Sequence, residues 1–248
     1  MKKYDIFLFD ADGTLYDYDK AEAHALKAMF DYCGFNYSEG IRTKYRKINT
    51  QAWESYEKGE ISKGDLQINR FVSLFNEIDV QYDAKKFNEK YLLELGKGAF
   101  LIDGALEICK AITSCNKQIF VVTNGILATQ EARIKHSLIE KYITDFFVSE
   151  FVGYQKPDER YFEYVFSHIP AAWTSSCKYE GSPYLEKPAP QLEKDKILIV
   201  GDSLSADIAG GNKAGIDSCW FNEHGKENHT GILPTYEINS LHELQKFI

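Results

Sequence analysis

Two aspartates, Asp10 and Asp12, stand two residues apart directly after the apolar run Ile6-Phe7-Leu8-Phe9, which is typical of a buried strand. Side chains at i and i+2 of a strand share a face, so both carboxylates can face one small volume if Asp12 keeps strand geometry. Two anions this close repel each other unless one holds a proton or a cation lies between them. The pair therefore suggests a nucleophile, Asp10, with an acid/base partner, Asp12, and a divalent cation. An ordinary strand-to-turn junction also fits, because Asp and Gly are common there.

A second pair of carboxylates follows another predicted strand. Asp202 comes directly after the run that starts at Ile197, and Asp207 lies one turn into the helix expected over 205–214. The two carboxylates can converge above the strand end, and hard oxygen ligands of this kind suit Mg²⁺. The helix dipole alone also favours an aspartate near a helix N-terminus, so Asp207 by itself is ambiguous.

Thr123 and Lys156 carry groups that a phosphate needs. Thr123 ends a β-rich run and precedes Asn124-Gly125, which offers a hydroxyl beside exposed backbone N–H groups. Lys156 precedes Pro157 at a predicted helix start, where a cation is unfavourable unless carboxylates or a phosphate hold it. A plain strand cap and a solvated surface lysine are the alternatives.

The elements that must position these residues alternate between strand and helix over residues 98–248. Strands are predicted at 118–122, 146–148, 197–200 and 218–221, and helices at 105–112, 127–138, 157–167, 205–214 and 241–247. This alternation predicts an α/β fold, a Rossmann-like parallel sheet with helices on both faces. Ligands in such sheets bind beyond the carboxyl ends of the strands, where Asp10, Thr123 and Asp202 lie.

Residues 17–97 show no strand pattern and predict four helices, which resemble a four-helix bundle inserted into the α/β unit. We therefore expect a core of residues 1–16 and 98–248 and a separate helical domain of residues 17–97. Hinges are expected near Leu15-Tyr16 and Gly96-Lys97-Gly98, where the chain can change direction cheaply.

Composition excludes several classes of protein. The net charge of −8 and the lack of an obvious basic patch argue against binding a nucleic-acid polymer. No apolar window is long enough to span a bilayer, and the first apolar run ends too early for a signal peptide, so we expect a cytoplasmic protein that does not bind membranes. The five cysteines form no CxxC pair and predict reduced thiols.

Residues 170–195 hold four of the six prolines and little periodicity. We expect a surface excursion here, with a short hairpin at Ser182-Pro183, because a loop of this length is unusual inside a compact domain.

Four stretches of this chain resemble, in order, the four motifs of the haloacid dehalogenase superfamily. They are Asp10-Ala11-Asp12-Gly13-Thr14, Thr123, Lys156 with its proline, and Gly201-Asp202-Ser203-x-x-x-Asp207. The resemblance covers the whole chain, and the helical insertion resembles the C1 cap of that superfamily. The pyrimidine 5′-nucleotidase branch is the closer match, through Lys47–Ile61, Arg70-Phe71, Thr123–Gly125, Ser149–Gly153 and Cys219–Asn222. The longer segment 170–195 departs from that branch.

This resemblance implies a Mg²⁺-dependent phosphomonoester hydrolase with an aspartyl-phosphate intermediate. Asp10 would attack phosphorus, and Asp12 would protonate the leaving oxygen and then deprotonate the hydrolytic water. Asp10, the carbonyl of Asp12 and Asp202 would hold Mg²⁺, with Asp207 in support. The phosphate would be bound by Asp10, Thr123, Asn124 and Lys156. Positioning and charge neutralisation are what phosphoryl transfer requires.

Other activities share parts of this pattern. A dehalogenase needs the aspartate nucleophile but neither Asp12 nor the carboxylate pair. A sugar-phosphate phosphatase or phosphomutase of the same superfamily shares the core motifs and differs in the cap. A non-catalytic binding module would not need all of these groups together.

The substrate is a small phosphorylated molecule whose remaining part the cap must recognise. Tyr45, Asn49 and Trp53 recur every four residues and so share one face of the predicted second helix. An amide beside aromatic rings suits a nucleobase, although the same rings would also suit packing of the bundle. The resemblance favours a pyrimidine nucleoside 5′-monophosphate and leaves open whether the protein is a monomer or a homodimer.

Overall fold

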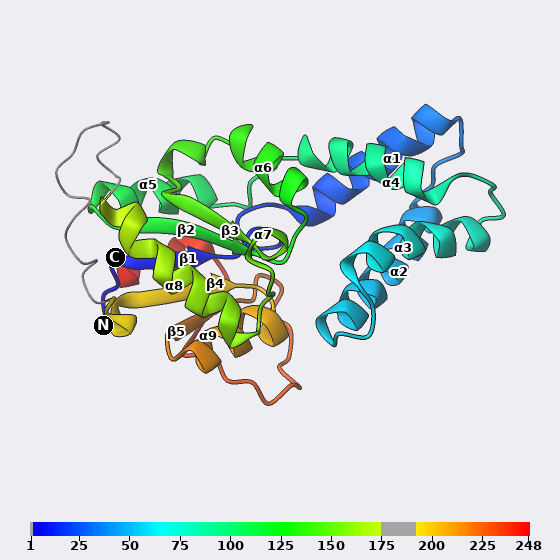
Figure 1. Ribbon diagram of the computed structural model, residues 1–248. Coiled ribbons are helices and arrows are strands. Elements are labelled where there is room, and N and C mark those ends of the chain that lie inside the picture. Colours follow the sequence, from blue (N-terminus) through cyan, green and yellow to red (C-terminus); the bar gives the residue numbers. More distant parts are fainter. Residues whose placement is uncertain (1, 175–191) are drawn as a thin grey trace.

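A six-stranded sheet forms the middle layer of the larger part of the computed structural model, on the left of Figure 1; the structure describes residues 2–174 and 192–248. All strand pairs are parallel, in the order β3-β2-β1-β4-β5-β6. The strands are β1 (Ile6–Phe9), β2 (Gln118–Thr123), β3 (Asp145–Val148), β4 (Ile197–Gly201), β5 (Asp217–Phe221) and β6 (Tyr236–Ile238). The predicted α/β fold is therefore confirmed.

Both faces of the sheet are covered because strand side chains alternate. Phe7 and Phe9 of β1 pack with α5 (Ala105–Ser114), α6 (Leu127–Lys135) and η5 (Leu241–Phe247) on one face. Ile6 and Leu8 pack with α8 (Glu159–Thr174) and α9 (Ala209–Ala214) on the other. Burying each such side chain contributes about 1.5–3 kcal/mol, so a two-sided apolar strand is stable only between two layers.

Four helices between β1 and α5 pack around a core of their own, on the right of Figure 1. They are α1 (Tyr18–Cys33), α2 (Glu39–Glu57), α3 (Lys63–Glu77) and α4 (Ala84–Gly96). Ser62 and Asp65 form a capping box at the start of α3, and the Asp83 side chain caps α4. Every residue from 17 to 97 is described, and no strand lies among them. The exact division into core and cap stays a prediction.

Several local predictions were wrong. Strand β6 was missed because it has only three residues with a central glutamate. Helix α8 continues to Thr174, so residues 170–174 are not a loop, while residues 175–191, including the expected hairpin and Cys177, lie outside the described residues. The expected helix at 205–214 begins as η4 (Leu204–Ile208), a π-type turn that precedes α9.

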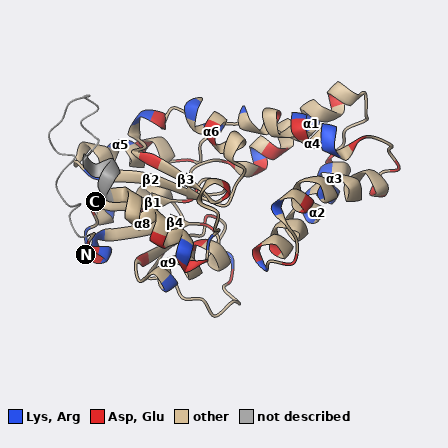
Figure 2. Cartoon of the chain, viewed as in Figure 1, with Lys and Arg blue, Asp and Glu red and all other residues tan. Residues whose placement is uncertain are grey.

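Shorter elements complete the part of the chain that the structure describes: η1 (Glu140–Tyr142), α7 (Ser149–Val152) and η3 (Lys194–Lys196). Charges of both signs are spread over the outer helices, whereas β1, β2 and β4 are uncharged (Figure 2). Among the described helices none is long and apolar enough to cross a membrane. Cys33, Cys109, Cys115 and Cys219 are free thiols.

Candidate active site

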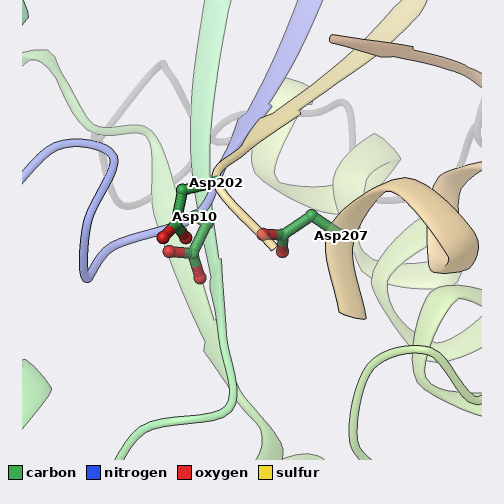
Figure 3. A group of neighbouring side chains, drawn as sticks. All are labelled: Asp10, Asp202 and Asp207. Atoms are coloured by element: carbon green, nitrogen blue, oxygen red, sulfur yellow. The ribbon is translucent and has the colours of Figure 1, made fainter. Parts of the chain in front are cut away.

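Three carboxylates meet where β1 and β4 end (Figure 3). The register pairs Phe9 with Val200, so Asp10 and Asp202 leave neighbouring strands at nearly the same level. Asp207 reaches them from η4, and one oxygen of each carboxylate lies within 4.8 Å of the others. The sheet thus brings together residues that the sequence places almost 200 positions apart.

Two glycines allow the turns after these strands to pack closely. Gly13 has a φ of +84°, and a Cβ on it would lie 2.7 Å from Asp202 Oδ2. A Cβ on Gly201 would overlap the Asp207 carboxylate. The absence of a side chain at both positions therefore makes the convergence of carboxylates possible.

Lys156 is the cation of this cluster. Its buried Nζ donates to Asp10 Oδ1 at 2.7 Å, to Asp207 Oδ1 at 2.6 Å and to the Val122 carbonyl at 2.7 Å. Burial alone would lower the pKa of Lys156, but the two carboxylates raise it above its ordinary value, so the ammonium is fully charged at neutral pH.

The charge balance of the cluster suits a divalent cation. Burial and the neighbouring Asp207 and Asp202 carboxylates raise the pKa of Asp10, against the effect of Lys156. Burial and Asp207 likewise raise the pKa of Asp202 to about 7. One ammonium does not neutralise three carboxylates, and hard oxygen donors at this spacing fit Mg²⁺.

Asp12 has a different environment from Asp10. Its Oδ2 accepts a hydrogen bond from Gln130 Nε2 at 2.6 Å, and its Oδ1 pairs with Arg133, a fully buried residue. Both partners come from α6 and were not identified from the sequence. Their spacing of three on one helical face was the only available signal. The side chain of Asp12 therefore lies outside the three-carboxylate cluster.

The loop after β2 provides the expected hydroxyl. Thr123 is buried, and its Oγ1 accepts the Gly125 N–H at 3.0 Å, which leaves its own O–H free to donate. The Asn124 side chain is instead engaged with the backbone of Lys156, through Nδ2 to the carbonyl at 2.9 Å and Oδ1 to the N–H at 2.8 Å. The Asn124 amide thus holds Lys156 in place.

A cavity of about 750 Å³ opens above this cluster and extends to the cap, which is ample for a nucleotide-sized ligand. The core lines it with Asp10, Asp12, Thr123, Lys156, Asp202 and Asp207 among others. The cap contributes Tyr18, Asp19, Arg46, Trp53 and Glu57.

Of the three cap residues expected to read the substrate, only Trp53 lines this cavity. Tyr45 is fully buried and stacks on Phe71 with ring centroids 5.3 Å apart. Asn49 is also buried, and its amide bonds Tyr18, Glu22 and Arg70, so it acts behind the cavity wall. Tyr45 and Asn49 do not line the cavity, because the face they share with Trp53 turns partly into the cap core.

Further cavity residues were missed by the sequence reading. Arg46 Nη2 contacts both oxygens of Asp19 at 2.6 Å, an ion pair between α1 and α2. Tyr18 and Glu57 lie at the ends of these helices. Sequence spacing gave no signal for these residues, because they meet only when the helices pack.

A sequence model of a family described as "Haloacid dehalogenase-like hydrolase" matches residues 7–221. The chain is 37% identical over 246 residues to the HAD-hydrolase YfnB of Bacillus subtilis, covering 98% of this chain and 95% of YfnB. It is 33% identical to the pyrimidine 5′-nucleotidase PynA of Streptococcus pneumoniae over 241 residues (97% and 93% of the two chains). It is 31% identical to the pyrimidine 5′-nucleotidase YjjG of Escherichia coli over 247 residues (99% and 98%). A crystal structure of YfnB bound to magnesium has a TM-score of 0.85 at 35% identity and covers 99% of this chain and 98% of that chain.

Proposed function

The chain belongs to the haloacid dehalogenase-like hydrolase family, and from this premise we propose that it is a Mg²⁺-dependent phosphomonoesterase acting on a pyrimidine nucleoside 5′-monophosphate. The observation that carries the proposal is the cluster of Asp10, Asp202 and Asp207 at the floor of a large cavity, where the Lys156 ammonium pairs with Asp10 and Asp207 and the Thr123 hydroxyl lies nearby. Such a site concentrates the groups that bind and neutralise a transferring phosphoryl group.

Each group has a defined task in the proposed reaction. A carboxylate oxygen of Asp10 forms a bond to phosphorus while the ester bond breaks, and Asp12 gives its proton to the leaving oxygen. Water then attacks phosphorus, Asp12 takes the proton of the water, and the bond between Asp10 and phosphorus breaks. The Thr123 hydroxyl donates to the phosphoryl oxygens throughout, and the Lys156 ammonium does so once it releases one of its three acceptors, Asp10, Asp207 or the Val122 carbonyl.

Mg²⁺ would be held by Asp10, Asp202 and Asp207 together with the carbonyl of Asp12, and when bound it would neutralise charge on the phosphoryl group. Asp12 must also leave at least one of its α6 partners to reach a leaving oxygen, since Gln130 and Arg133 occupy both of its carboxylate oxygens.

The nucleotide assignment rests on the cavity and the relatives. Trp53 and Tyr18 give the cap side aromatic faces, and the Asp19–Arg46 pair gives it polar groups, a combination that suits a nucleobase. PynA and YjjG, which match nearly the whole chain, carry the name pyrimidine 5′-nucleotidase. A sugar-phosphate phosphatase remains the second candidate, because the core groups would serve either substrate.

Phosphate release from UMP, dUMP, dTMP, AMP and a hexose phosphate tests the proposal, with Mg²⁺ and with excess chelator. We expect kcat/KM to be highest for the pyrimidine nucleotides and activity to vanish with chelator. Asp10→Asn should fold like the wild type and lose turnover entirely. Preference for the hexose phosphate would favour the second candidate, and retained turnover in Asp10→Asn, with deamidation excluded, would refute the mechanism.

A further inference from the structure

The end of α2 and the start of α3 contact the core at three places. Ser205 Oγ donates to Glu57 Oε2 at 3.0 Å, and Gln155 Nε2 donates to the Tyr56 carbonyl at 3.2 Å. Lys63, the first residue of α3, makes the third contact. Ser205, Gln155, Asn124 and Gly125 each lie within three residues of a residue of the site described above, and Ser149 begins α7. These contacts therefore seat the cap on the catalytic loops.

The Lys63 contact is the most extensive of the three. Its Nζ donates to the Asn124 carbonyl at 2.9 Å, the Gly125 carbonyl at 3.0 Å and Ser149 Oγ at 2.8 Å. These acceptors use all three donors of an ammonium group. Lys63 is half-buried, and this burial lowers its pKa to about 8, against the opposing effect of the Glu150 carboxylate.

This contact reaches the phosphate-binding groups through short, rigid links. Because the peptide bond is planar and trans, fixing the Asn124 carbonyl also fixes the Gly125 N–H, which donates to Thr123 Oγ1 at 3.0 Å. The Asn124 side chain holds the backbone of Lys156 by two hydrogen bonds. Lys63 thus acts on both Thr123 and Lys156 without touching the cavity.

We propose that Lys63 is a positioning residue that holds the loop 123–125 in its phosphate-binding geometry, so that seating the cap and completing the phosphate site are one event. The inference deepens the proposed function, on which it depends in taking this loop as the phosphate-binding loop. Lys63 itself does not contact the phosphate, because it lies outside the cavity wall.

The test compares Lys63→Met with Lys86→Met, a matched change at an exposed lysine of α4. We expect Lys63→Met to raise the Ki of inorganic phosphate and the KM of p-nitrophenyl phosphate at least about tenfold, the loss expected for a charged hydrogen-bond donor. Hydrogen exchange in residues 123–127 should become faster, while the Tm stays close to that of Lys86→Met. A lower Tm with unchanged Ki, KM and exchange would show a merely structural lysine and overturn the inference.

A second variant keeps the test decisive if Lys63→Met folds poorly. Ser149→Ala removes one of the three acceptors and should move Ki and exchange in the same direction by a smaller factor; no change in either would overturn the inference. If the wild type neither hydrolyses phosphate esters nor binds phosphate, the proposed function fails. The hydrogen-exchange measurement then decides by itself whether Lys63 positions the loop 123–125. Unchanged exchange at 123–127 in Lys63→Met would refute the positioning role, and faster exchange would support it.

Discussion

At the scale of single residues, Asp10 and Asp12 show how neighbouring carboxylates acquire different roles. Asp10 faces a buried lysine and two further carboxylates, whereas Asp12 faces Gln130 and the buried Arg133 of α6. Environments that differ this much separate a nucleophile from an acid/base group on the same turn. Strand β1 ends at Phe9, so strand alternation does not fix the direction of Asp12, and the two carboxylates contact different partners although both line the cavity.

Asp12→Asn separates these roles by kinetics. We expect kcat for a nucleotide to fall about 10²–10⁴-fold, because the leaving oxygen loses its proton donor. With p-nitrophenyl phosphate, whose leaving group needs no proton, the first step should be largely spared, so we expect a burst of p-nitrophenolate followed by slow turnover, because Asp12 is still needed to take the proton of the water. A thermal melt serves as the control, since Arg133 loses its carboxylate partner. A near-wild-type kcat for the nucleotide, or the absence of a burst with p-nitrophenyl phosphate, would contradict the two roles proposed for Asp12.

Glu22 predicts a pH-dependent stability. It is a buried carboxyl of the cap, and burial, with a smaller contribution from Asp19 and against Arg46, raises its pKa from 4.5 to about 7. The folded protein therefore binds this proton more tightly than the unfolded chain does, so Glu22 makes stability fall as the pH rises from about 4.5 to about 7.

Glu22→Gln removes this dependence. We expect the free energy of unfolding of the variant to exceed that of the wild type by about 2–3 kcal/mol at about pH 8 and to match it at about pH 5. Urea unfolding at both pH values measures the difference. An equal difference at the two pH values would show that packing, not charge, is responsible.

At the scale of elements, the site depends on the turns that follow the strands. Gly13, in the turn after β1, packs against Asp202, and Gly201, the last residue of β4, packs against Asp207. Parallel strands place these turns side by side, and the glycines remove the side chains that would keep them apart. Helix α6 contributes the partners of Asp12 and also contacts the cap, where Thr129 Oγ1 donates to the Leu92 carbonyl at 3.4 Å.

Gly13→Ala should disturb the site beyond its cost in backbone strain. The matched control is Gly34→Ala, which has a φ of +71° but nothing within 4 Å of an added Cβ, whereas the Cβ at Gly13 meets Asp202. We expect both variants to lose about 1–3 kcal/mol of stability, since both place alanine at a positive φ. Only Gly13→Ala should raise the Mg²⁺ concentration needed for half-maximal activity. The same Mg²⁺ requirement in both variants would contradict this.

At the scale of the whole molecule, the chain builds a hydrophobic cluster on each face of the sheet and a third in the cap, and both the α/β unit and the cap line the cavity. The two connections between them run side by side, since the Asp17 N–H donates to the Phe100 carbonyl at 2.9 Å and the Ile102 N–H donates to the Leu15 carbonyl at 3.0 Å. Such paired connections can bend together while each core stays intact.

We therefore predict that residues 1–16 with 98–248 and residues 17–97 move as two units. Crystal structures with and without Mg²⁺ and phosphate should superpose within each unit, and backbone dihedral angles should change mainly near residues 15–17 and 96–98. Bending inside 17–97, with unchanged connections, would show that the boundary is misplaced.

The sequence alone determined the α/β fold and the edge of the sheet at which the site forms. Asp10, Thr123 and Asp202 each end an apolar run. The carboxyl ends of parallel strands lie at one edge of the sheet, however the helices pack against its faces. The helical insertion was also predictable, because its apolar residues recur with helical spacing over four segments.

Only the tertiary structure decided which side chains around that edge contact one another. Gln130 meets Asp12 across 118 positions, Lys63 reaches the loop after β2, and Tyr45 turns into the cap core instead of the cavity. Helical spacing shows which residues share a face but not which neighbour that face meets, because that depends on how distant helices pack. A short motif can be recognised from residues adjacent in the sequence. The residues that orient its side chains are distant in the sequence and meet them only in the folded protein.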